Sequence, residues 1–143
     1  MTRFTPAVAF VIAAVAVASA QPADDFKAAA GKWTVTKATL GGKDFTKAFK
    51  GVELVLAADG AYTLTVGGES DKGTVKVDAA KTPKEMDIIG MEGPNAGKTF
   101  RTIYKHDGNA MTVCYELGDG PRPTAFESKA GTKVFLAVYK RAK

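Results

Sequence analysis

Hydrophobic and polar residues alternate along most of this chain with a period of two. The run from Tyr62 to Val66 is the clearest example, because threonines separate its three apolar residues. This period is typical of β-strands that have one buried face and one face in water. The pattern predicts eight strands, near residues 32–37, 52–56, 62–66, 74–78, 85–91, 98–106, 110–117 and 132–140.

Short turn signals between these runs predict antiparallel neighbours. Asp59-Gly60, Gly67-Gly68 and Asp107-Gly108 each separate two alternating segments, as in tight hairpins. The gaps leave no room for a series of crossover helices, which a parallel sheet needs. An open sheet of this kind would expose two edges. We therefore expect an all-β fold, an eight-stranded antiparallel up-and-down barrel that encloses either a filled core or one small-ligand cavity. A β-sandwich is the competing architecture.

One or two short helices are also expected. Residues 24–30 begin with acidic residues, are rich in alanine and are followed by Gly31. Asp44 can cap a second short helix that ends near Gly51 and carries Phe45 and Phe49 on one face. Such a face would cover the mouth of the barrel, either as a moving lid or as a plug that completes the core.

The first twenty residues have the pattern of a secretory signal peptide. Arg3 precedes an apolar run from Ala7 to Ala20 that ends in Ala18-Ser19-Ala20, a small-residue cleavage pattern. The run is shorter than the roughly 20 residues that span a bilayer. We expect residues 21–143 to form a single exported domain with no membrane span, located in the periplasm, the cell envelope or the medium.

Composition excludes several kinds of partner and site. The chain has a net charge of +5, but its lysines are scattered, so a nucleic-acid partner is not expected. One histidine and one cysteine, Cys114, exclude a disulfide within the chain and the usual metal sites, and Cys114 is expected to be buried. The run Gly93–Thr99 has three residues between its glycines, where a phosphate-binding loop needs four, and a strand pattern follows it.

No catalytic motif and no cofactor site emerge, so we expect a protein that is not an enzyme. Carboxylates such as Glu69, Asp87 and Glu116 keep a hydrolase open as a further alternative. It would require two carboxylates within about 5–10 Å of each other in a cleft.

Two sets of residues are candidates for binding. The first set faces the predicted interior or covers it, and would contact a small, partly apolar ligand: Trp33, Phe45, Phe49, Leu54, Tyr62, Leu64, Tyr104, Met111 and Tyr115. The second is the long connection before the last strand, where Arg122 lies between two prolines and Phe126 follows. It would contact an envelope protein or a polysaccharide. Alternatively, Phe126 packs under the barrel while Arg122 pairs with a carboxylate or caps carbonyls.

Gly31-Lys32-Trp33, at the start of the first strand and after a short helix, is similar to the G-x-W motif of lipocalins. This resemblance implies that Trp33 closes one end of the barrel. It also implies that a basic residue near the end of the last strand, here Arg141, packs over the indole in a cation–π contact. Gly31, Trp33 and Arg141 are thus the expected closure residues.

A longer series of motifs resembles an uncharacterised lipocalin-like domain family abundant in planctomycete bacteria. The resemblance covers about Phe26 to Arg141, and its motifs are Gly31–Val35, Gly93-Pro94, Gly97–Thr99, Ile103-Tyr104, Asp107-Gly108, Met111–Tyr115 and Arg122–Phe126. It implies a lipocalin-like or calycin-type barrel and an exported setting, and it implies no reaction. The expected function is binding of a small, partly apolar ligand, and the alternative is an interaction or structural module of the cell envelope.

Overall fold

The structure is a computed structural model that describes residues 22–142; the predicted signal peptide, residues 1–20, lies outside this range. Within it, eleven elements follow one another along the chain. They are α1 (Pro22–Ala29), β1 (Gly31–Leu40), β2 (Lys43–Asp44), the 3₁₀ helix η1 (Thr46–Phe49), β3 (Glu53–Leu56), β4 (Ala61–Val66), β5 (Glu69–Asp78), β6 (Lys84–Glu92), β7 (Thr99–Asp107), β8 (Ala110–Glu116) and β9 (Val134–Arg141).

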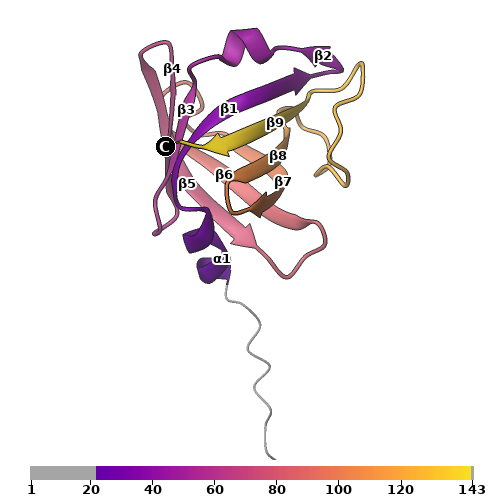
Figure 1. The fold of residues 1–143 in the computed structure, drawn as a ribbon. Helices are drawn as coiled ribbons and strands as arrows, with labels where there is room; N and C mark the ends of the chain where they lie inside the picture. Colours follow the sequence, from indigo (N-terminus) through magenta and orange to yellow (C-terminus); the bar gives the residue numbers. More distant parts are fainter. Residues whose placement is uncertain (1–21, 143) are drawn as a thin grey trace, which may run out of the picture.

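The strands form one closed antiparallel barrel (Figure 1). From β3 to β9 each strand pairs with the next along the chain, and β1 pairs with both β3 and β9. The pairing of β1 with β9 runs from Trp33 opposite Arg141 to Leu40 opposite Phe135, with a bulge between Val35 and Lys37. The predicted eight-stranded barrel is therefore confirmed, and the sandwich is excluded. The two-residue strand β2, which pairs only with the end of β1, was not predicted.

The two ends of the barrel differ. Helix α1 lies at one end, which we call the closed end (Figure 1). Its Phe26 and Ala29 are buried in the core, and the Trp33 indole N–H donates to the Ala29 carbonyl at 2.9 Å. The opposite end, which we call the mouth, carries η1 and the β4–β5 and β6–β7 turns. Helix α1 thus closes one end of the barrel through Phe26 and Ala29.

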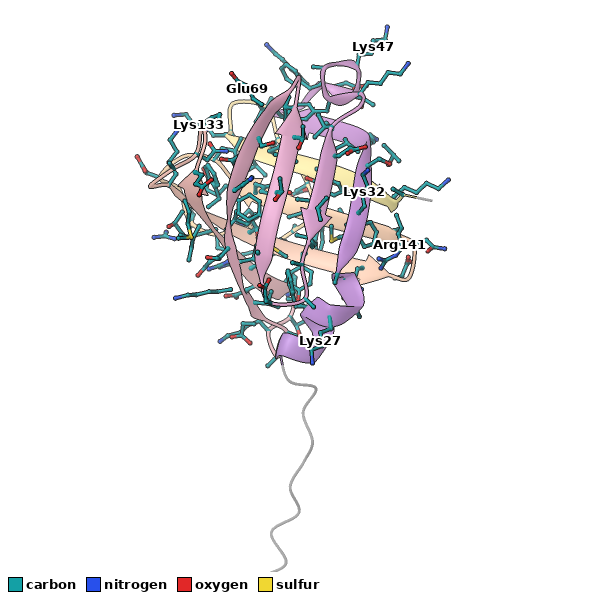
Figure 2. All side chains as sticks on the ribbon, turned by 90° about the vertical axis from the view of Figure 1, so that its left-hand side faces the viewer. Lys27, Lys32, Lys47, Glu69, Lys133 and Arg141 are labelled. Atoms are coloured by element: carbon teal, nitrogen blue, oxygen red, sulfur yellow. The ribbon has the colours of Figure 1, made fainter. Side chains whose placement is uncertain are left out.

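The outer surface of the barrel carries charged side chains. Lys32 on β1 pairs with Glu53 on β3 at 3.2 Å, and both side chains are about half exposed. Figure 2 shows Lys47, Glu69 and Lys133 toward the mouth and Lys27 at the closed end.

Within residues 22–142, no helix is long and apolar enough to cross a membrane.

Candidate ligand-binding site

A cavity of about 360 Å³ occupies the interior of the barrel and reaches its mouth. Most of its lining is aliphatic or aromatic, because the alternating strands turn their apolar side chains inward. Six of the residues predicted to bind a ligand line it: Phe49, Leu54, Tyr62, Leu64, Met111 and Tyr115. The volume lies near the lower end of the range for small-molecule sites, about 300–1,000 Å³.

Three residues of the same predicted set lie elsewhere. Trp33 and Tyr104 are almost fully buried in the core and do not line the cavity. Phe45 is 37% exposed, because the segment expected to form an α-helix is only the four-residue η1, and Phe45 stands just before it. Positions i and i+4 share a face in an α-helix but not in this arrangement. Only Phe49 turns toward the interior, where its ring lies 4.9 Å from that of Phe135.

The predicted closure residues meet at the closed end. The Arg141 guanidinium lies 4.3 Å from the centre of the Trp33 ring. The same group donates to the carbonyls of Ala28, Ala30 and Gly108, and so ties α1 to the β7–β8 turn. Gly31 has φ +132°, and a Cβ at this position would lie 2.7 Å from Arg141 Nη1. A glycine here lets the guanidinium reach the indole.

A polar group that the sequence analysis missed faces the cavity near the mouth. Asp71 on β5 is 7% exposed and lines the cavity. Its Oδ2 accepts from the Tyr62 hydroxyl at 3.2 Å and from the Asn95 side-chain amide at 2.9 Å, and its Oδ1 accepts from the Asn95 backbone N–H at 3.1 Å. Burial, followed by the charge of Asp71, raises the pKa of Tyr62 to about 12. Tyr62 is therefore a neutral donor to Asp71 at physiological pH.

Asn95 reaches Asp71 because the β6–β7 turn folds back against the end of β6. Gly97 N–H donates to the Gly90 carbonyl at 3.0 Å, and Gly90 N–H donates to the Lys98 carbonyl at 2.8 Å. A Cβ at Gly90 would lie 1.9 Å from the Asn95 carbonyl oxygen, so only glycine permits this approach. The glycine-rich run rejected as a phosphate loop is thus a turn that brings Asn95 over Asp71 and Lys98 to the cavity wall.

A second polar group consists of two tyrosines. The hydroxyls of Tyr115 on β8 and Tyr139 on β9 are 2.7 Å apart, and both residues line the cavity. Burial raises the pKa of Tyr139 to about 12 and that of Tyr115 well above its usual value. Both hydroxyls therefore remain protonated at neutral pH. One hydroxyl hydrogen forms the bond between the two tyrosines, so the hydrogen of the other hydroxyl can be donated to a third group.

The long connection between β8 and β9 lies along the outer wall of the barrel from Arg122 to Glu127. Arg122 pairs with Glu85 at 3.3 Å and with Asp87 at 2.5 Å, and it donates to the carbonyls of Met86 and Thr102. These contacts are the intramolecular alternative stated above for Arg122. Phe126 does not pack under the barrel, because it lies on the outer face with Lys105 Nζ 4.6 Å from the centre of its ring.

The same connection buries the one cysteine, as predicted. Cys114 has no exposed surface, and its sulfur lies 3.6 Å from the Ala125 carbonyl oxygen and 3.7 Å from that of Glu127. Its neighbours Val113 and Tyr115 line the cavity, so Cys114 faces the opposite side of β8. Burial raises the pKa of its thiol, which keeps it in the unreactive protonated form.

One signal in the sequence points to Asp71. The run Glu69–Lys72 is polar and lies between the Gly67-Gly68 turn and the predicted strand, which begins only at residue 74. Asp71 is nevertheless in phase with Val75 and Val77, both of which pack on the core. Extending the alternation backwards by two steps places its carboxylate inside. Nothing in the sequence indicates the contact with Asn95, which is 24 residues away.

In comparisons with known proteins, no family model and no curated protein matches this chain. Among solved structures, it is similar to a DUF4847 family protein from Bacteroides vulgatus, with a TM-score of 0.51 and 14% sequence identity. The similarity covers 80% of this chain and 94% of the other. At this level of identity the likeness concerns the fold alone, a barrel domain of uncharacterised function.

Proposed function

We propose that this protein is an exported, lipocalin-like, non-enzymatic barrel that binds a small, partly apolar molecule in its interior. The cavity of about 360 Å³ carries this proposal. It combines a largely apolar wall with a few polar groups near one another, the usual composition of a small-molecule site. The signal-peptide pattern of residues 1–20 supports export.

Contacts on the outer face favour ligand binding in the cavity over the two alternatives, binding of an envelope partner and hydrolysis. The guanidinium of Arg122 contacts two carboxylates and two carbonyls of the barrel, so most of its N–H groups are already used within the chain. Two carboxylates considered for hydrolysis serve structural roles as well. Asp87 is the partner of Arg122, and Glu116 accepts the Gly118 N–H at 2.9 Å.

A neutral fluorescent probe tests the proposal. N-phenyl-naphthylamine brightens in apolar surroundings, and we expect it to bind one site per chain. Leu64→Trp fills the cavity from its wall and should weaken binding by at least about tenfold, more than 1.4 kcal/mol. Thr63→Trp adds the same side chain to the outer face of β4 and should leave binding unchanged. Absence of probe binding to the unmodified protein, or equal binding by both variants, would contradict the proposal.

A further inference from the structure

The cavity contains one buried carboxylate, that of Asp71, and no cation among the described side chains contacts it. Within residues 22–142, the groups that hydrogen-bond to Asp71 are a tyrosine hydroxyl, a backbone N–H and a side-chain amide, all of them neutral. A buried charge is costly unless it is paired with an opposite charge. The three donors lower this cost and fix the carboxylate in place, but they leave its negative charge uncompensated.

The carboxylate also has an acceptor position that none of these donors uses. Its two oxygens offer about four acceptor positions. Two of the three donors reach Oδ2 and one reaches Oδ1, so a position on Oδ1 is left. Because Asp71 lines the cavity, a bound molecule can supply the missing donor.

The position of Asp71 orients such a molecule. Asp71 is the third residue of β5, which begins at the mouth, and the β6–β7 turn holds it from above through Asn95. Deeper in the barrel, the wall is formed by side chains such as Leu54, Met111 and Val113. A ligand with its polar end at Asp71 would therefore place its apolar end among these residues.

Building on the proposed binding function, we propose that Asp71 makes the cavity selective for ligands that carry a protonated amine on an apolar body. The ammonium group supplies both the absent positive charge and a hydrogen bond to Oδ1. Lys98, at the wall of the same cavity, is exposed and is the alternative anchor, and it would instead favour a carboxylate.

Three ligands that differ only in their end group test this selectivity. Octylamine, octanol and octanoate are titrated against bound N-phenyl-naphthylamine at neutral pH, where the amine is protonated. Octylamine should displace the probe at a concentration at least about tenfold lower than octanol does, because a hydrogen bond to a charged group is stronger than a neutral one. Octanoate should be the weakest of the three.

Three variants test whether Asp71 causes the preference for octylamine over octanol. Asp71→Asn should abolish the advantage of octylamine over octanol while the probe still binds. Glu69→Gln removes the same charge from an exposed position two residues earlier on β5 and should retain the advantage. Lys98→Gln should retain it too. The series on the unmodified chain provides the test even if Asp71→Asn does not fold.

The possible failures are distinguishable. If the probe binds but octanoate is the tightest ligand, or if octylamine keeps its advantage in Asp71→Asn, the role of Asp71 is refuted and the binding function stands. If the probe does not bind to the unmodified protein, the binding function itself is refuted.

Discussion

Replacement of Arg141 by alanine removes the side chain that joins three parts of the closed end. The guanidinium stacks on Trp33 and donates to carbonyls at the end of α1 and in the β7–β8 turn. Arg141→Ala leaves these acceptors to water and uncovers one face of the indole. We expect a loss of stability without a change of fold, because the strand pairing of β9 uses only the backbone.

The size of the loss follows from these contacts. A cation–π contact at a partly exposed site contributes about 1 kcal/mol. Each of the three carbonyls loses a hydrogen bond with a net value of about 0.5–1 kcal/mol at a partly exposed position. Together these contacts give a decrease of about 3 kcal/mol in the free energy of unfolding, a large part of the roughly 5–15 kcal/mol typical of a domain.

Urea denaturation measures this loss. Far-UV circular dichroism is the appropriate probe, because the fluorescence of Trp33 responds directly to the loss of the guanidinium. Lys140→Ala, at the exposed neighbouring position, is the control and should cost less than about 0.5 kcal/mol. Arg141→Lys keeps the charge but loses the planar fork, so it should recover part of the loss. A cost below about 1 kcal/mol for Arg141→Ala would refute the reasoning.

Two further predictions concern the cavity wall. Gly90→Ala places a Cβ against the Asn95 carbonyl and should destabilise the protein by about 1–3 kcal/mol in urea denaturation, whereas an unchanged midpoint would contradict the close approach. The raised pKa values of Tyr62 and Tyr139, both about 12, mean that the folded state favours the neutral hydroxyl. Their contribution to stability should be complete below pH 10 and lost as the pH rises from 10 toward 12; near-UV absorbance titration should show tyrosinate forming late in the folded protein and near pH 10 in urea.

The strands were predictable because each carries its own evidence. In β4, the alternation of Tyr62, Leu64 and Val66 with threonines fixes which side chains turn inward, and the neighbouring glycine turns fix the antiparallel order. Closure follows from the need to pair the edges of β1 and β9. Strand alternation and glycine turns are local patterns, so they can be recognised in a single sequence.

The polar part of the site was not predictable in the same way. Asp71 lies before the predicted start of its strand, and Asn95 reaches it only because Gly90 permits a close backbone approach. Contacts of this kind depend on side chains far apart in the sequence and on the exact fold of a turn. The position of Arg122 could not be predicted for the same reason. Its carboxylate partners, Glu85 and Asp87, lie on β6, far from Arg122 in the sequence.

The outward path of the segment between Leu117 and Lys133 has a consequence for access to the cavity. Contacts of Arg122 and Cys114 hold this segment against the outer wall, so it does not cover the mouth of the barrel. The rim of the cavity is formed instead by side chains such as Phe49, which packs against Phe135. For the proposed binding function, this arrangement leaves the route to the cavity free of the longest connection within residues 22–142.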